Sequence, residues 1–241
     1  MIARHAVRTT DLVKTYGKRR ALDGFSLDVP AGCVLGLVGP NGAGKTTWMM
    51  SVAGLLGVSS GTVDLFGTGK AFDAAIHSGR LSILPQDSEL PLESTPKGFL
   101  TGLARLQELS PAAAKTEANR ILNALNLADR ASASIRSLSH GMRKRLMAAQ
   151  CFLGDPELVL LDEPMNGLDP EEALRMRNLI LAHPSNCAVV VSSHNLGDLE
   201  RFCTHVAFVY AGRVTKTVRL ADLAAEGKTL EAEYLSSARR R

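Results

Sequence analysis

Long hydrophobic runs are missing from this sequence of 241 residues. Its longest apolar stretches, such as residues 158–161 and 188–191, are far shorter than the roughly 20 residues that a membrane-spanning helix needs. The N-terminus alternates charged and apolar residues, so the apolar block of a secretory signal peptide is also absent. We therefore expect no membrane span, no signal peptide and a cytoplasmic location.

Cysteine is scarce, and neither sign of charge is in large excess. Cys33, Cys151, Cys187 and Cys203 lack the paired spacing of a zinc site, so we expect four small, buried and reduced side chains. The 28 basic and 24 acidic residues give a net charge of +4, which is too weak an excess to indicate a nucleic-acid partner. A content of 45% apolar and 22% charged residues is ordinary for a globular protein and excludes a disordered chain.

A glycine-rich segment follows the apolar run at residues 34–38 and fits the pattern G-x-x-x-x-G-K-[ST]. Its residues are Gly39, Pro40, Asn41, Gly42, Ala43, Gly44, Lys45, Thr46 and Thr47. Between a strand and a helix, such glycines let backbone N–H groups converge on a polyphosphate, and the helix N-terminus adds partial positive charge. We expect a bound nucleoside triphosphate, with Lys45 on its β- and γ-phosphates and the Thr46 hydroxyl on Mg²⁺. The alternative is a turn that binds no ligand.

The order of apolar patterns predicts an α/β fold. Short strands are expected at 6–14, 25–29, 34–38 and 62–65, with a helix at about 45–53. Residues 95–128 change to helical spacing, which predicts an inserted helical subdomain. Apolar runs at 158–161, 188–191 and 206–210 then alternate with helices at 172–181 and 196–203. This alternation is typical of a mostly parallel sheet with crossover helices.

Two acids follow the apolar run at 158–161. Such a run is typical of a strand buried on both faces, whose C-terminal tip meets a ligand crevice. We expect Asp162 to hold Mg²⁺ and Glu163 to polarise a water molecule beside the γ-phosphate. A strand that ends in solvated acids is the alternative. No separate phosphate acceptor is implied, so hydrolysis is favoured over transfer to a second substrate.

Nearly the whole chain resembles the ATP-binding-cassette family. Ser139, His140, Gly141 and Met142 follow Leu138 as a relative of the family's signature L-S-G-G-Q, and a basic helix start comes after them. The resemblance implies that this segment contacts the γ-phosphate of an ATP held by a second copy, through a small hydroxyl and backbone amides at a helix N-terminus. The alternative is a serine that only caps a helix.

Further residues match the family in its own order. By resemblance, Tyr16 stacks on adenine, worth about 1–3 kcal/mol per base, Gln86 contacts Mg²⁺ and the attacking water, and His194 contacts the γ-phosphate. Asp169 is similar to the aspartate that links the two ATP sites at the dimer interface. The alternatives are an ordinary turn tyrosine for Tyr16, a structural histidine for His194, and an ordinary turn before Pro170 for Asp169.

The resemblance implies one cassette domain with three kinds of structure. It has a P-loop nucleoside-triphosphatase core at 1–86 and 150–225, which includes an N-terminal antiparallel β subdomain. A helical subdomain with the signature occupies 87–149, and a C-terminal tail 226–241. His140 and Met142 depart from the glycine and glutamine of the family, and Met165 stands where threonine is frequent. We expect the site to be active, with reduced turnover as the alternative, and assign no effect to Met165.

The function implied is that of an ATP hydrolase, with ATP and Mg²⁺ as ligands. It would act as a dimer on the cytoplasmic face of the membrane and drive a separate integral-membrane permease, as an exporter by preference and an importer otherwise. The permease would dock between Gln86 and residues 92–106, where Phe99 and Leu100 either face the groove or, as we favour, belong to the core. Cassette ATPases of DNA repair or translation are disfavoured, since they carry coiled-coil insertions or two cassettes. The N-K-x-D segment of a GTPase is absent.

Overall fold

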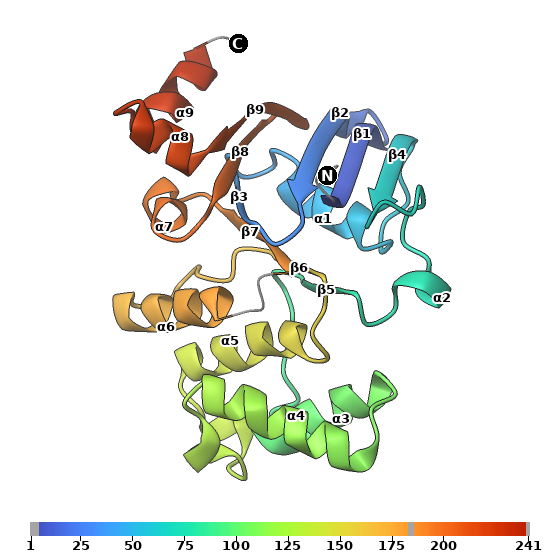
Figure 1. Cartoon of the computed structure of the whole chain (residues 1–241), viewed down its shortest axis with the longest axis vertical. Helices are drawn as coiled ribbons and strands as arrows, with labels where there is room; N and C mark the ends of the chain where they lie inside the picture. The colour runs from blue at the N-terminus through green and yellow to red at the C-terminus, as the bar shows by residue number, and fades with distance from the viewer. Residues whose placement is uncertain (1–4, 183–185, 240–241) are drawn as a thin grey trace.

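An antiparallel sheet forms one layer of the molecule (Figure 1). In the computed structural model, which describes residues 5–182 and 186–239, its strands are β1 (His5–Tyr16), β2 (Arg19–Pro30) and β4 (Ser60–Leu65), in the order β2-β1-β4. Gly17, with φ of 55°, lies in the two-residue turn between β1 and β2, where the left-handed conformation matches the twist of a hairpin. Sequence reasoning predicted only the second half of β2, because its first residues are charged.

A six-stranded sheet forms the central layer, in the order β5-β6-β7-β3-β8-β9. Its strands are β5 (Leu81–Leu84), β6 (Leu158–Leu161), β7 (Ala188–Ser193), β3 (Val34–Val38), β8 (His205–Tyr210) and β9 (Arg213–Arg219). The first five are parallel, and β9 pairs antiparallel with β8. Every residue of β6 and β7 is buried, which explains their continuous apolar runs. The predicted mostly parallel sheet is confirmed, but β5 and β9 were missed because edge strands lack such runs.

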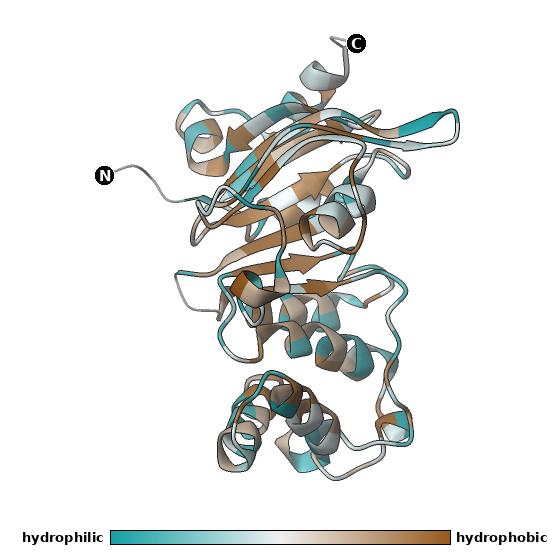
Figure 2. Cartoon of the chain, turned by 90° about the vertical axis from the view of Figure 1, so that its right-hand side faces the viewer, coloured by the Kyte–Doolittle hydropathy of each residue, from teal (hydrophilic) through white to brown (hydrophobic). Residues whose placement is uncertain are grey.

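The central sheet separates two cores, because alternate residues of a strand point to opposite faces. Leu158 and Leu160 of β6 pack into the core that contains the antiparallel sheet and α1 (Lys45–Val52). Val159 and Leu161 pack into the core of the opposite face. Figure 2 shows hydrophobic residues concentrated along these central strands. In the first core Trp48 stacks on Phe25 at 5.7 Å between ring centroids.

The helical subdomain lies below the central sheet in Figure 1. It contains α3 (Pro96–Leu106), α4 (Pro111–Ala124) and α5 (His140–Ala149), with short 3₁₀ turns at Ala128–Arg130, Ile135–Ser137 and Gln150–Phe152. Thr95 and Ser110 cap α3 and α4, each of which has proline in its first turn. Leu100 is fully buried, which confirms the preferred core interpretation for this residue, and Phe99 is partly buried and packs against the same core.

Five further helices complete the described chain. α6 (Pro170–Leu181) and α7 (Leu196–Glu200) follow β6 and β7, α2 (Ala74–His77) precedes β5, and α8 (Leu220–Ala225) and α9 (Leu230–Arg239) follow β9. Tyr234 of α9 packs edge-on against Phe208 of β8 at 5.5 Å, so most of the predicted tail is a packed helix; residues 240 and 241 lie outside the described residues. All four cysteines are buried and free, as predicted. Among the described helices none is both long and apolar enough to cross a membrane.

Candidate nucleotide site

The glycine-rich loop joins β3 to α1, as predicted, and two of its glycines have no room for a side chain. A Cβ on Gly39 would lie 2.1 Å from the Val209 carbonyl oxygen. Gly44 adopts φ of 110°, and a Cβ there would lie 2.7 Å from the Ala21 carbonyl oxygen. Glycine is therefore required at both positions by the packing of the loop against β2 and β8.

Lys45 is buried at the base of this loop. Its Nζ donates hydrogen bonds to the carbonyl oxygens of Gly39 at 2.7 Å and Pro40 at 3.3 Å. The same atom lies 3.8 Å from Oε1 of Glu163. Burial lowers the pKa of Lys45, and the carboxylates of Glu163 and Asp162 oppose that shift. The ammonium group is thus held between the loop and the two predicted acids.

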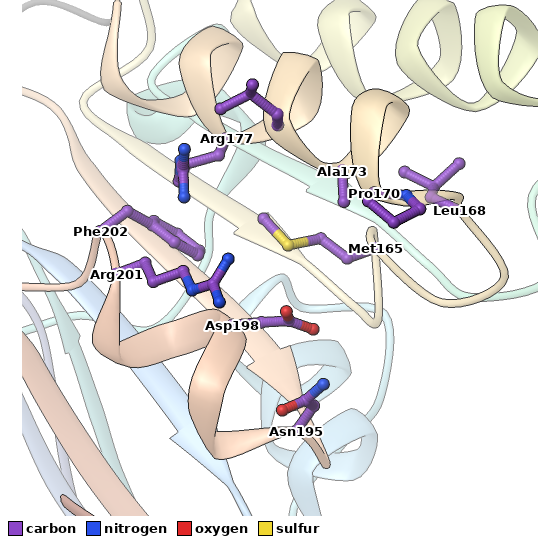
Figure 3. A pocket seen from close by; sticks show the side chains of 10 residues that line it. Met165, Leu168, Pro170, Ala173, Arg177, Asn195, Asp198, Arg201 and Phe202 are labelled. Carbon is purple, nitrogen blue, oxygen red and sulfur yellow. The ribbon is translucent and has the colours of Figure 1, made fainter.

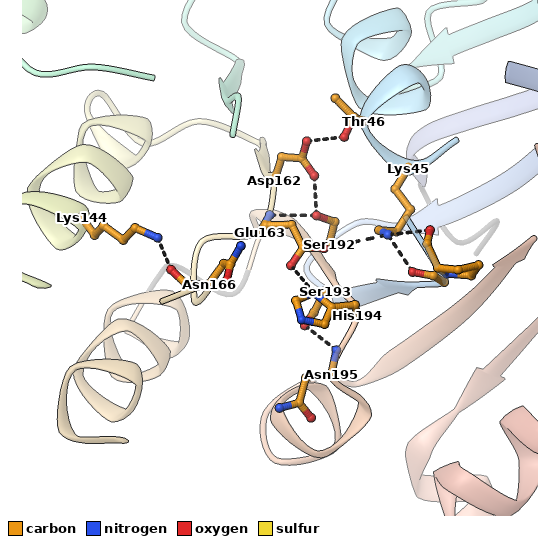
Figure 4. A network of polar contacts seen from close by, with 12 residues as sticks. Lys45, Thr46, Lys144, Asp162, Glu163, Asn166, Ser192, Ser193, His194 and Asn195 are labelled. Carbon is orange, nitrogen blue, oxygen red and sulfur yellow. Dashed lines mark hydrogen bonds and ion pairs between the residues drawn. The ribbon is translucent and has the colours of Figure 1, made fainter. Parts of the chain in front are cut away.

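A chain of hydroxyl and carboxylate groups crosses from α1 to β7 (Figure 4). The Thr46 hydroxyl donates to Oδ2 of Asp162 at 2.5 Å, and the Ser192 hydroxyl donates to Oδ1 of the same carboxylate at 2.5 Å. The backbone N–H of Glu163 donates to Oγ of Ser192 at 2.8 Å. Ser192 therefore orients both acids. Sequence reasoning missed it, although its position just before His194 at the end of a buried strand was visible.

Glu163 adopts a backbone conformation that is rare for a residue with a side chain. Its φ is 49°, a left-handed geometry that costs on the order of 1–3 kcal/mol outside glycine. Its carboxylate Oε2 lies 3.1 Å from Nδ1 of His194, which is half exposed. The loop after β7 thus meets the loop after β6, and the predicted base and histidine are in contact.

The loop and the acids surround an open cavity of about 220 Å³. Gln86, Asp162 and Glu163 line it together with Arg19, Ala21 and loop residues 41–47. Arg19 and Ala21 were not predicted. Both lie on β2, and residues two apart on a strand share a face. Tyr16 itself is half exposed and is not among the lining residues, while Nζ of Lys14 lies 5.2 Å from its ring centroid.

Comparison with known proteins identifies this combination of fold and site. Residues 22–166, more than half of the chain, match the family model described as ABC transporter. The chain belongs to this family. The cassette is 33% identical over 210 residues to the daunorubicin/doxorubicin resistance ATP-binding protein DrrA of Streptomyces peucetius, covering 87% of this chain and 64% of that protein.

Other comparisons agree with the family and the fold. The cassette is 32% identical over 214 residues to the bacitracin transport ATP-binding protein BcrA of Bacillus licheniformis, covering 88% of this chain and 69% of that protein. It therefore spans about two thirds of the length of these relatives. A solved ATP binding subunit of an ABC transporter superposes with a TM-score of 0.82 at 25% identity, covering 97% of this chain and 99% of that one. The predicted family and α/β fold are confirmed.

The signature segment of the cassette lies outside its own cavity. Ser139 is exposed and caps α5 by accepting a hydrogen bond from the Met142 N–H at 3.1 Å, and His140 is also exposed. Gly141 is buried, and a Cβ there would lie 2.5 Å from Cγ of Glu172 on α6. Packing within the chain therefore already requires this glycine, whatever the segment contacts in a second molecule.

Asp169 also lies away from the cavity that Lys45 and Glu163 line. Its carboxylate accepts a hydrogen bond from the Glu172 N–H at 2.9 Å and caps α6. The structure thus gathers Lys45, Thr46, Gln86, Asp162, Glu163 and His194, and it leaves Tyr16, the signature segment and Asp169 outside that group.

A larger cavity of about 510 Å³ lies between α6 and α7 (Figure 3). Met165 and Asn195, which closely follow Glu163 and His194 in sequence, line it together with Arg177 of α6 and with Arg201 and Phe202 just after α7. No glycine is among the residues that line this cavity. The cavity of the phosphate loop is therefore the candidate nucleotide site despite its smaller volume, and Met165 is assigned to the wall of the other cavity.

Proposed function

We propose that this chain is the ATP-hydrolysing subunit of a transporter. The observation that carries the proposal is the convergence of Lys45 and Thr46 from α1, Asp162 and Glu163 from the end of β6, and His194 from the end of β7. The carboxyl ends of parallel strands are where ligands bind in open α/β sheets. The proposal has three parts: the binding of ATP, the loss of its γ-phosphate, and the transmission of the resulting movement.

The binding step follows from the loop. Its backbone N–H groups and the start of α1 face the phosphates, and the Lys45 ammonium supplies positive charge at the same end. Lys45 already contacts two carbonyl oxygens of the loop, so phosphate oxygens would replace acceptors that it holds in this structure. Ala21 adds an apolar wall, and Tyr16 offers a half-exposed ring to the base.

The donor set of the cavity fits Mg²⁺. A hydroxyl, a carboxylate and an amide oxygen, from Thr46, Asp162 and Gln86, line one wall, and Mg²⁺ binds through one or two protein oxygens together with substrate phosphates and water. Mg²⁺, when bound, neutralises the charge on the phosphate oxygens. Ser192 holds the Asp162 carboxylate toward Thr46, so this arrangement exists before the nucleotide enters.

Glu163 is the proposed general base. Its buried carboxylate lies beside Lys45 on one side and His194 on the other, so a water molecule placed between Glu163 and the γ-phosphate would be oriented by fixed groups. His194 holds the carboxylate and would contact the γ-phosphate from the solvent side. No second substrate hydroxyl is required, which favours hydrolysis over phosphate transfer.

The wider assembly follows from the position of the signature. Ser139 and His140 at the start of α5 are exposed to solvent, where a second copy would present its ATP. Two molecules would then close around two nucleotides and open after hydrolysis. Relatives named for drug resistance and bacitracin transport support export, with an integral-membrane permease as the partner on the cytoplasmic face; import is the second candidate. The α3 side of the helical subdomain and Gln86 are the proposed docking region.

The proposal is tested by measuring phosphate release from Mg·ATP by the purified chain and by its Glu163→Gln variant. We expect the variant to bind ATP but to lose turnover by about 10²–10³-fold, as for other single groups that act in the transition state. Glu157→Gln, which alters an acid of the partly exposed Arg80 pair outside the site, should keep activity. Equal turnover of Glu163→Gln and the unmodified chain would remove Glu163 from the mechanism, and failure of the unmodified chain to bind ATP would remove the proposed function.

A further inference from the structure

Two adjacent arginines at the start of β2 have different surroundings. Nη1 of Arg20 donates a hydrogen bond to Oδ1 of Asp23 at 2.7 Å, and Asp23 also pairs with Arg213. Arg19 instead lines the nucleotide cavity, and its Nη2 lies 3.5 Å from the Gly42 carbonyl oxygen. Neighbouring residues of a strand point to opposite faces, so only one of the two arginines faces the phosphate loop.

The guanidinium group of Arg19 lacks a carboxylate partner among the residues that the structure describes. Its one hydrogen bond is the long contact with Gly42. A guanidinium group stays charged at every physiological pH and carries five N–H donors in a planar fork suited to phosphate oxygens. Arg19 therefore brings a positive charge and several free donors to the wall of the cavity.

The charges already inside the cavity do not balance a triphosphate. Lys45 is positive, whereas Asp162 and Glu163 are acids that lie against it, so these three groups together contribute about one negative charge at neutral pH. The phosphate chain adds several more. A second cation in the lining lowers the electrostatic cost of binding, and Arg19 is the lining residue besides Lys45 that provides one.

We propose that Arg19 binds the phosphate chain of the nucleotide from the β2 side of the cavity and so raises affinity for phosphorylated nucleotides. The inference rests on the proposed function, because it concerns the same cavity. No family motif identified in the sequence includes this arginine. The absence of a side chain at Gly42 leaves room for the guanidinium group, because a Cβ at that position would lie 3.0 Å from Nη2 of Arg19.

This role is tested by titrating four proteins with ATP in a calorimeter. They are the unmodified chain, Arg19→Gln, Arg19→Lys and Arg20→Gln. At about 50 mM salt we expect Arg19→Gln to raise the Kd for ATP about five- to tenfold, as for loss of one charge-assisted contact. Arg20→Gln, the matched control on the same strand, should leave the Kd within about twofold. Arg19→Lys should recover part of the affinity, because it restores the charge without the planar fork.

Repeating the titrations at about 500 mM salt separates a charge effect from a structural one. The difference between the unmodified chain and Arg19→Gln should shrink at high salt, because screening weakens the contact. An unchanged Kd for Arg19→Gln, or an equal loss at both salt concentrations that Arg19→Lys does not recover, would overturn the role of Arg19 while leaving ATP binding established. Absence of ATP binding by the unmodified chain would instead overturn the proposed function itself.

Discussion

Nε of Arg145 on α5 lies 2.7 Å from Oε2 of Glu172 on α6, and both side chains are largely buried. Nη1 of Arg145 also donates to the Leu125 carbonyl oxygen at 2.6 Å, at the end of α4. One residue earlier, Nζ of Lys144 donates to the carbonyl oxygen of Asn166, ahead of α6 (Figure 4). The helix that begins at the signature is therefore fixed to the segment that contains Asp169, so the two segments should move together.

Loss of this buried pair should destabilise the fold strongly. Arg145→Met leaves Oε2 of Glu172 without its buried partner, while Oε1 keeps its contact with the partly exposed Arg175 at 2.8 Å. We therefore expect the free energy of unfolding to fall by about 3 kcal/mol in a urea titration, the lower end for a broken buried pair. Replacing both residues with methionine should recover most of the loss, since apolar side chains of similar size tolerate such sites. Arg136→Gln, which removes an exposed pair with Glu93, should cost about 0–1 kcal/mol. A similar small cost for Arg145→Met would show that the pair does not hold the helices together.

Ser192 should affect turnover more than binding. Its buried hydroxyl orients Asp162 and accepts the Glu163 N–H, yet it does not line the nucleotide cavity. We expect Ser192→Ala to lower kcat about tenfold or more, because misplacement of both acids disturbs the reacting geometry. The Kd for ATP should stay within about twofold. Steady-state kinetics and calorimetry measure the two effects, and Ser193→Ala, which alters only the contact with Asn195, is the control. Equal losses in both variants would contradict the assignment.

His77 should make stability sensitive to acid. The ring is fully buried beside Phe66 and Phe72, and its Nδ1 accepts the Asp73 N–H at 3.0 Å. Burial lowers the pKa of His77 from its ordinary value of 6.5; Arg80 and Lys70 add to the shift, whereas Asp73 opposes it. The unfolded chain then binds the proton more readily than the folded one.

The corresponding loss of stability begins as the pH falls through 6.5 and ends at the lower pKa of the folded state. In that window one proton changes the free energy of unfolding by at most about 1.4 kcal/mol per pH unit. Urea titrations between about pH 8 and pH 5 should show this slope reduced in His77→Gln, whose amide can accept the same N–H without titrating. Identical slopes for the two proteins would assign the acid sensitivity to other groups.

The parts of the fold that could be predicted are those with strong local patterns. Buried parallel strands read as apolar runs, and Gly39, Gly44 and Lys45 stand in a loop whose backbone geometry dictates their identity. Edge strands such as β9 leave no such pattern, because most of their residues face water. Pairings between distant segments are also invisible locally, which is why Arg19 beside Gly42 and Glu172 beneath Gly141 emerged only from the structure.

Dimerisation by ATP should depend on Ser139 without depending on the fold. In Glu163→Gln, where nucleotide is expected to persist, we expect ATP and Mg²⁺ to produce a dimer at micromolar concentration, measured by light scattering. Ser139 caps α5 through its side-chain oxygen, and aspartate is an equally good cap. Ser139→Asp in the same background therefore keeps the helix but sets a negative charge against the phosphate of the partner's ATP. We expect this double variant to bind ATP and remain monomeric. A dimer that forms equally in both proteins would show that the two molecules meet through a surface other than the signature.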